Sequence, residues 1–196
     1  TNHRKILKKR YIDKETKQHY LRADFFDNCE PLVKTDLLDI DLNTFDLIVI
    51  SDYNKGLINK NLVDYLRNNY QGLIFVDSKK KDLSIYKNCI IKINDIEFKE
   101  STKIPKNCEL IITKGSEGAL HNNKTYSAYP AKNVIDICGA GDNFLAGLTI
   151  MYHATKDFPK SINFANYCAA TCLNTIGVKP FTKKEIKDYV NKVFKM

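Results

Sequence analysis

Short runs of hydrophobic residues alternate with longer amphipathic segments along most of this chain. Continuous apolar runs predict buried strands at 45–50, 73–76, 90–93 and 110–112. Between the first two runs, the segment from Asn59 to Gly72 carries Leu62, Val63 and Leu66 at helical spacing. Strands that alternate with helices in this way are typical of an α/β fold with a mostly parallel sheet.

Two segments predict β-hairpins, and the last third of the chain predicts helices. Residues 6–12 and 18–26 alternate in character around a polar turn at 13–16, and a second hairpin is expected around 122–124. A polar connector over 28–44, with a short helix at 34–42, leads to the first buried strand. Helices are expected at 144–152, 159–174 and 182–194, the last opened by a capping box of Thr182 and Glu185. These helices should cover one face of the sheet.

The stretch 136–142, with the sequence D-I-C-G-A-G-D, has the clearest chemistry. Its two glycines let the backbone turn tightly, so that the amides of Ala140, Gly141 and Asp142 can converge at the start of a helix and bind an anion. Asp142 would then lie where a hydroxyl attacking a phosphoryl group needs a proton acceptor. The alternative is a glycine-rich loop in which Asp142 is an ordinary helix N-cap.

Two further polar turns follow apolar strands. Thr113–Gly118 comes directly after 110–112, and Asn94–Glu97 comes after 90–93. Open α/β sheets bind their ligands at the carboxyl ends of the strands, so three such turns together favour an anion site over a simple cap. The strand–helix–strand pattern over 45–76 further predicts that Tyr53, Lys55, Asp77 and Lys79 emerge at the same rim of the sheet.

With these turns, the sequence resembles the PfkB-type, ribokinase-like carbohydrate kinases. Their signature D-T-x-G-A-G-D is preceded by N-x-x-E and T-x-G-x-x-G turns in the same order. Within that family the chain is most similar to the D-glycero-D-manno-heptose 7-phosphate kinases, because of S-D-Y-N-K-G at 51–56, D-S-K at 77–79, K-R-Y-I at 9–12 and Q-H-Y-L-R-A-D at 18–24. The resemblance covers nearly the whole chain. It implies one domain over 1–196 with a ribokinase-like fold, a β-hairpin lid at 1–27 and a nucleotide-binding α/β core at 45–196.

The resemblance also implies an ATP-dependent sugar or sugar-phosphate kinase that uses Mg²⁺. Asp142 would be the base, the amides of Gly139, Ala140 and Gly141 would hold the developing charge, and Glu97 would organise Mg²⁺ through water. The other implied nucleotide-binding residues are Asn94, Thr113, Gly115, Ser116, Gly118, Lys79 and Asn166, with Gly177 a weaker candidate; the implied substrate residues are Arg10, Arg22, Asp24 and Lys55. Exposed charges on the hairpin, and close helix packing by Ala165, Ala169 and Ala170 near Asn166, are the structural alternatives.

The chain departs from the family pattern in two ways that bear on function. Ile137 and Cys138 stand where hydroxyl residues are common, which argues against K⁺ activation even though Asp136 remains as a candidate cation ligand. The chain also begins inside the pattern, at the lid, so we expect a homo-oligomer or a complementing N-terminal segment to complete the sugar site. A non-catalytic nucleotide-binding remnant, or a ribokinase-like or fructokinase-like enzyme with another acceptor, is the alternative function.

Composition narrows the function classes further. The 196 residues suffice for one well-buried domain, and 43% hydrophobic with 28% charged residues is ordinary for a folded protein. The net charge of +8 comes from lysines spread among asparagines and isoleucines, which suits sugar phosphates and nucleotides better than nucleic acid. Six cysteines without a C-x-x-C pair favour a reducing cytoplasm and no structural metal. No apolar run is long enough for a membrane span.

Overall fold

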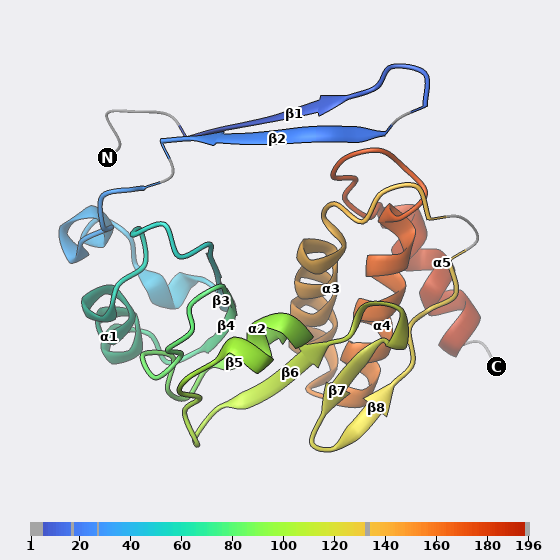
Figure 1. The fold of residues 1–196 in the computed structure, drawn as a ribbon. Helices are drawn as coiled ribbons and strands as arrows, with labels where there is room; N and C mark the ends of the chain where they lie inside the picture. Colours follow the sequence, from blue (N-terminus) through green and yellow to red (C-terminus); the bar gives the residue numbers. More distant parts are fainter. Residues whose placement is uncertain (1–5, 17, 27, 132–133, 195–196) are drawn as a thin grey trace. The chain divides into compact units, whose positions relative to one another are not determined.

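The computed structural model describes residues 6–16, 18–26, 28–131 and 134–194 (Figure 1). The chain forms two compact units, one from residues 1–44 and 52–71 and the other from 45–51 and 72–196. Residues 52–71 therefore group with the hairpin, although the sequence led us to expect them in the core range 45–196. The expected lid range 1–27 also includes residues 1–5, 17 and 27, which lie outside the described residues.

The first unit contains the predicted hairpin and one helix. Strands β1 (Leu7–Ile12) and β2 (His19–Phe25) pair antiparallel, as predicted. The connector forms two short 3₁₀ helices, η1 (Lys34–Leu37) and η2 (Leu42–Thr44), in place of the single helix expected over 34–42. Helix α1 (Lys60–Asn69) begins after Asn59, whose Oδ1 accepts the Leu62 N–H at 2.9 Å. That bond is an N-cap, which explains why the helix starts there.

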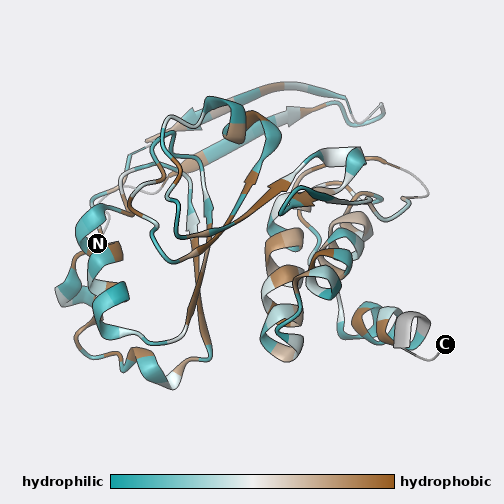
Figure 2. Ribbon diagram, turned by 90° about the horizontal axis from the view of Figure 1, so that it is seen from below, coloured by the Kyte–Doolittle hydropathy of each residue, from teal (hydrophilic) through white to brown (hydrophobic). Residues whose placement is uncertain are grey.

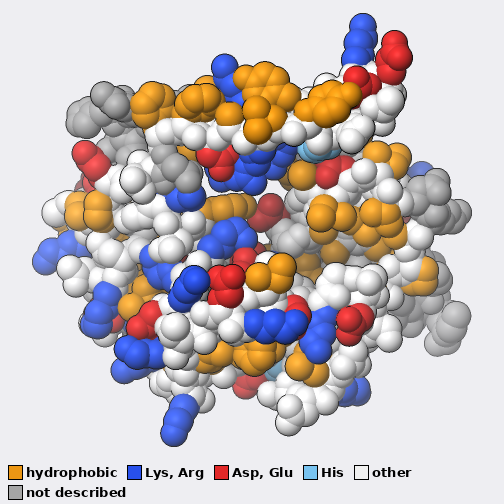
Figure 3. All heavy atoms as spheres, viewed as in Figure 1, with side chains coloured by type: hydrophobic (Ala, Val, Ile, Leu, Met, Phe, Trp, Pro, Cys, Tyr) orange, Lys and Arg blue, Asp and Glu red, His pale blue; other side chains and the backbone are white. Residues whose placement is uncertain are grey.

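The register of the hairpin separates its side chains into a polar face and an apolar face. Lys8 lies opposite Asp24 and Arg10 opposite Arg22, and directly opposed residues of an antiparallel pair share a face. The other face carries exposed hydrophobic side chains, namely Leu7, Tyr11, Leu21 and Phe25. Figure 3 shows hydrophobic side chains gathered along one side of the hairpin. Three of the four predicted substrate residues therefore share the polar face.

The second unit is built on a six-stranded sheet with the order β3-β4-β5-β6-β7-β8. The strands are β3 (Leu47–Asp52), β4 (Leu73–Ser78), β5 (Ile90–Asn94), β6 (Glu109–Thr113), β7 (Ala119–His121) and β8 (Lys124–Tyr126). Strand β5 pairs parallel with β4 and β6, whereas β6, β7 and β8 pair antiparallel. Asn122 and Asn123 turn the β7–β8 hairpin with φ values of 48° and 61°, as two-residue hairpin turns require. The predicted strands and the second hairpin are confirmed.

Strand β3 is less buried than its apolar sequence suggests. Val49 is 45% exposed, whereas Ile74, Phe75 and Val76 of β4 are at most 2% exposed. The prediction that 45–50 is buried on both faces is therefore wrong. Strand β3 stands at one end of the strand order, with a hydrogen-bonded neighbour on one side among the described residues, and an outer strand has fewer neighbours to cover it.

Helices α3 (Ala140–Thr155) and α4 (Phe158–Cys172) lie side by side on one face of this sheet (Figure 1). Helix α5 (Lys183–Phe194) follows them, and the short α2 (Asp95–Glu100) follows β5. The core between sheet and helices contains Phe75, Ile90, Ile111, Phe144, Leu145, Leu148 and Ile162. The central strands carry the hydrophobic colouring in Figure 2. Complete burial of a residue such as Leu148 contributes about 1.5–3 kcal/mol. Within the described part of the chain, no helix is long and apolar enough to cross a membrane.

The contact between α3 and α4 depends on a glycine. A Cβ atom at Gly147 would lie 2.8 Å from Cys168 Sγ and 3.2 Å from the backbone of Ala165. Ala165 and Cys168 of α4 therefore serve close helix packing, the structural alternative that the sequence left open for Ala165.

We expect Gly147→Ala to lower the free energy of unfolding by about 1–3 kcal/mol, because the added methyl group has no space between the helices. Urea unfolding measures the effect. Gly177→Asn is the control, because nothing lies within 4 Å of a Cβ there and its φ of +78° is one that Asn tolerates. An equal loss in both variants would contradict this account of Gly147.

Cys168 lies in a second core cluster with Met151, Phe164 and Tyr189. Burial, with a smaller contribution from the charge of Glu185, raises the pKa of the Cys168 thiol to about 12. The thiolate is the reactive form, so this thiol should be nearly inert in the folded protein.

We expect iodoacetamide at pH 8 to modify Cys29 in the folded protein and to leave Cys168 unmodified, because Cys29 is only partly buried. In urea both thiols should react at similar rates. Peptide mass spectrometry follows each site, and rapid modification of Cys168 before unfolding would show that the helices do not seal it.

Candidate active site

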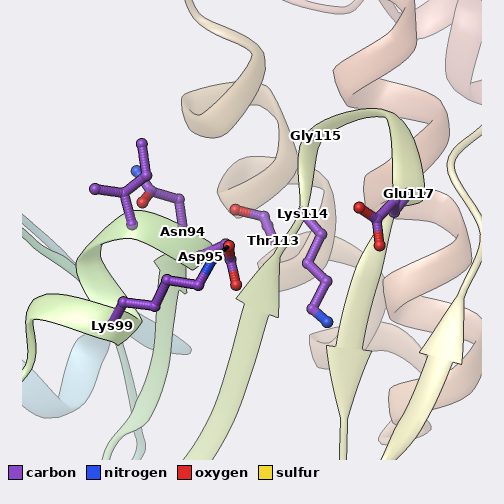
Figure 4. Close-up of a pocket in the computed structure, with 8 residues that line it drawn as sticks. Asn94, Asp95, Lys99, Thr113, Lys114, Gly115 and Glu117 are labelled. Carbon is purple, nitrogen blue, oxygen red and sulfur yellow. Dashed lines mark hydrogen bonds and ion pairs between the residues drawn. The ribbon is translucent and has the colours of Figure 1, made fainter.

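The candidate site forms where β5 and β6 end. An open pocket of about 520 Å³ lies between the start of α2 and the turn after β6 (Figure 4). Its lining consists of Asn94, Asp95, Ile96, Lys99, Thr113, Lys114, Gly115 and Glu117. The structure thus brings together the predicted nucleotide residues Asn94, Thr113 and Gly115, with Ser116 and Gly118 in the same turn. Strand ends of parallel sheets are common ligand sites because side chains and backbone from several loops converge there.

The two glycines of the turn after β6 have different roles. Gly115 has a φ of +56°, and nothing lies within 4 Å of the position of its missing Cβ, so a ligand can approach the backbone there. Gly118 has a φ of +95°, and a Cβ would lie 2.0 Å from the Tyr126 carbonyl oxygen. The Lys114 N–H donates to the Gly118 carbonyl at 2.7 Å and closes the turn. Gly118 is therefore required for the chain to pass β8, whereas Gly115 leaves open space.

The N-x-x-E turn is a helix capping box. Asn94 Oδ1 accepts the Glu97 N–H at 2.8 Å, and Glu97 Oε2 accepts the Asn94 N–H at 2.8 Å. The sequence analysis missed this role, although an amide or hydroxyl residue followed three positions later by Glu is the known signal for it. Glu97 Oε1 also accepts a bond of 2.7 Å from Lys79 Nζ, so two predicted site residues are in contact.

This arrangement bears on magnesium. The Glu97 side chain is 15% exposed and both its oxygens accept hydrogen bonds. Among the residues that the structure describes, no group of three His, Cys, Asp or Glu side chains could hold a metal ion. One carboxylate that already has partners fits the water-mediated role inferred for Glu97, because Mg²⁺ commonly keeps several waters.

The glycine turn leads directly into α3. Gly139 is the N-cap, with a φ of +82°, and Asp142 lies exposed in the first helical turn. The helix thus begins at Ala140 rather than at Phe144, and the alternative that Asp142 is the N-cap is wrong. The Ala140 N–H donates to the Ile137 carbonyl at 3.2 Å, so this amide of the expected anion hole is engaged within the turn. An acidic side chain in the first turn also interacts favourably with the helix dipole.

Two side chains hold this turn in place. Asp136 Oδ1 accepts the Cys138 N–H and Oδ2 accepts the Gly177 N–H, each at 2.9 Å. The buried Asn143 donates through Nδ2 to the carbonyls of Gly139 and Lys179, at 3.0 and 2.9 Å. Both Asp136 oxygens therefore accept backbone amides, and the role of Asp136 as a cation ligand stays a prediction. The role of Asn143 was not predicted from sequence.

A buried ion pair lies beneath the turn. Lys92 Nζ is 2.7 Å from Asp77 Oδ2, and the two residues are partners in the β4–β5 register. The side chains are only 5% and 13% exposed. A Cβ at Gly141 would lie 3.0 Å from Lys92 Nζ. The sequence analysis missed Lys92, although a lysine inside the run Ile90–Ile93 is a signal, because lysine is rarely buried without a partner.

Asn166 differs from the role implied by the resemblance. It is 6% exposed, and its Nδ2 donates to the carbonyls of Tyr126 and Ser127 at 3.1 and 3.0 Å. Both hydrogens of the amide group are thereby directed at backbone acceptors. In this structure Asn166 attaches α4 to the end of β8, which corrects its implied contact with adenine.

The four predicted substrate residues lie in the first unit. Arg22 donates to both carboxylate oxygens of Asp24, at 2.8 and 2.7 Å. These bonds, with the charges of Lys8 and Lys55, lower the pKa of Asp24. Arg10 lies opposite Arg22 across the hairpin. The hairpin therefore presents clustered basic side chains around one ionised carboxylate, with Lys55 close enough to interact with it.

Comparison with known sequences gives relatives that agree with these features. Bifunctional protein HldE of Campylobacter concisus is 32% identical over 171 residues, which is 75% of this chain and 36% of that protein. The protein of the same name from Helicobacter hepaticus is 29% identical over 76% of this chain and 36% of its own length. The protein of the same name from Sulfurimonas denitrificans is 28% identical over 90% of this chain and 41% of its own length. The chain thus spans about two fifths of the length of these relatives.

Solved structures show the same fold. A ribokinase from Thermotoga maritima superposes with a TM-score of 0.68 at 15% identity, over 94% of this chain and 69% of that one. A ribokinase from Arabidopsis thaliana, complexed with ribose and ATP, gives a TM-score of 0.68 at 17% identity, over 87% of this chain and 65% of that one. These superpositions establish the fold, and the predicted ribokinase-like architecture is confirmed.

The family model described as pfkB family carbohydrate kinase matches residues 90–184. This range contains the N-x-x-E turn, the turn after β6 and the glycine turn with Asp142. The predicted resemblance is therefore confirmed: residues 90–184 match the pfkB family of carbohydrate kinases, and the fold is ribokinase-like.

Proposed function

We propose that this chain transfers the γ-phosphoryl group of ATP to a hydroxyl group of a sugar phosphate, with a heptose 7-phosphate as the acceptor. The observation that carries the proposal is the glycine turn, which presents the exposed Asp142 at the start of α3. The pfkB match supports sugar phosphorylation, and the similarity to HldE proteins together with the S-D-Y-N-K-G motif supports heptose as the sugar.

Asp142 would act as the general base. Its carboxylate takes the proton of the acceptor hydroxyl while that oxygen forms a bond to phosphorus and the bond to the leaving phosphate oxygen breaks. Negative charge on the transferring group then faces the amino end of α3, a 16-residue helix whose dipole stabilises anions there. No other residue of the first helical turn carries an acidic side chain.

The pocket at the ends of β5 and β6 would hold the nucleotide. The open space at Gly115 allows close approach of the ligand to the backbone, and Lys79 supplies a positive charge beside Glu97. When bound, Mg²⁺ would neutralise phosphate charge and orient the phosphates. Glu97 would position it through water, because Mg²⁺ commonly keeps several waters and Glu97 Oε2 already accepts the Asn94 N–H.

The polar face of the hairpin would bind the acceptor. Arg10, Arg22 and Lys55 offer donors for an anionic group, and Asp24 accepts hydrogen bonds as sugar hydroxyls require. A phosphorylated sugar satisfies both kinds of group, whereas an unphosphorylated sugar offers no anionic group to these basic side chains. ATP as co-substrate and six free cysteines suit a reducing cytoplasm.

We expect Asp142→Asn to lower kcat by about 10²- to 10⁴-fold, because the proton acceptor is lost, and to change the Kd for ATP by less than about twofold. ADP release with heptose 7-phosphate gives kcat, and calorimetry gives Kd. Asp188→Asn, an exposed change on α5, is the control. Equal losses in kcat and affinity would contradict the role of Asp142 as the base.

ATP binding by the unmodified chain without turnover of any sugar phosphate would support the alternative of a nucleotide-binding remnant.

We expect Arg22→Gln to raise the KM for heptose 7-phosphate by about 10- to 100-fold, since charge-assisted hydrogen bonds contribute about 1.5–3 kcal/mol. The KM for ATP should not change. Lys14→Gln, in the turn of the same hairpin, is the control. If Arg22→Gln raised the KM for unphosphorylated heptose by the same factor, the arginine would not be recognising the phosphate.

A further inference from the structure

Lys92 is a buried cation in the middle of the sheet. Strand β5 has hydrogen-bonded neighbours on both sides, and the Lys92 side chain is only 5% exposed. Asp77 Oδ2 takes one of the three N–H donors of the ammonium group, at 2.7 Å. A buried ammonium is costly unless its charge and its donors are satisfied, so the reason for its presence needs to be found in its surroundings.

The backbone places this ammonium under the glycine turn. Ile90 packs in the core with Phe144 and Leu148 of α3, and residues two apart on a strand share a face. Lys92 therefore lies on the face of the sheet that α3 covers, two residues after Ile90 and closer to the start of that helix. The distance of 3.0 Å between Lys92 Nζ and a Cβ at Gly141 agrees with this position. Gly141 itself is exposed, so the ammonium lies directly behind an accessible surface.

The charges at this position favour an anion. The amino end of α3 carries a partial positive charge, and the Lys92 ammonium adds a full one beside it. Asp77 offsets the charge of Lys92, but stability does not require the pair, because apolar residues of similar volume commonly replace a buried ion pair without loss. An anion over the turn would interact favourably with both the helix end and the ammonium.

We propose that Lys92 is a phosphate-binding residue, whose ammonium is oriented by Asp77 and contacts a phosphate group seated on the turn 139–141. The inference rests on the proposed function and adds a residue to it. It also distinguishes two lysines. Lys79 is 48% exposed, so packing confines its side chain less. Lys92 is already fixed at the turn, and a fixed charge needs no rearrangement when the anion arrives.

The test uses a double substitution, because Lys92→Met alone would leave Asp77 buried without its partner. Asp77→Leu with Lys92→Met replaces both charges by apolar groups, and we expect an unchanged urea midpoint. Binding of ATP and of inorganic tripolyphosphate should weaken by about 10- to 100-fold, as loss of a charge-assisted hydrogen bond predicts, whereas adenosine should bind unchanged. Calorimetry at one fixed salt concentration measures all three.

The matched control is an exposed ion pair of the same kind. Lys103 Nζ lies 3.2 Å from Asp82 Oδ2 on the surface, and Asp82→Leu with Lys103→Met should leave all three affinities unchanged. Lys92→Gln with Asp77 intact keeps an N–H donor toward Asp77, and it serves as the second variant if the double substitution does not fold.

The outcomes separate the inference from the proposed function. If either Lys92 variant folds and binds tripolyphosphate as tightly as the unmodified chain does, the inference is overturned. If the unmodified chain binds tripolyphosphate through Lys92 but does not bind ATP, the phosphate role stands and the proposed function falls. If the unmodified chain binds neither probe, both are overturned.

Discussion

Hydrophobic contact between α3 and the sheet sets the position of everything polar around the glycine turn. Phe144, Leu145 and Leu148 are buried against the central strands, and the turn 139–141 lies one helical turn before them. The packing therefore holds the amino end of the helix at the level where the apolar part of the sheet ends. At that level β4 and β5 change from Phe75 and Ile90 to the ion pair of Asp77 and Lys92. The apolar core and the position of the amino end of α3 beside the ion pair are thus two consequences of one contact.

Sequence alone predicted the features that depend on neighbouring residues. Apolar runs predicted the strands, and the asparagine pair predicted the β7–β8 turn, because each of these features is determined by residues a few positions apart. The motifs also gave the turns that line the pocket. The bond of Lys92 to Asp77 and the bonds of Asn143 to the 179–181 segment join positions 15 to 38 residues apart, and no local pattern specifies such contacts. The start of α3 was missed because glycines disfavour helices in general, whereas here Gly139 supplies the left-handed N-cap.

Several residues of the predicted motifs stabilise the fold. Glu97 caps α2 with Asn94, Gly118 lets the backbone pass β8, and Asn166 attaches α4 to the same strand. A sequence motif therefore combines residues that shape the site with residues that are accessible to a ligand. Burial and hydrogen bonding separate the two sets: Gly115 borders open space and Asp142 is exposed, whereas the amide of Asn166 is directed at backbone acceptors.

The ion pair between Lys79 and Glu97 means that the carboxylate is already neutralised before a nucleotide arrives. Under the proposed function, a hydrated cation that enters with the phosphates would take over the carboxylate from Lys79, and the lysine would then be available to the phosphates. Binding would be an exchange of partners that conserves the number of opposite-charge contacts. Such a site would discriminate between a free anion and the same anion accompanied by a cation, since only the accompanied anion supplies a new partner for both members of the pair.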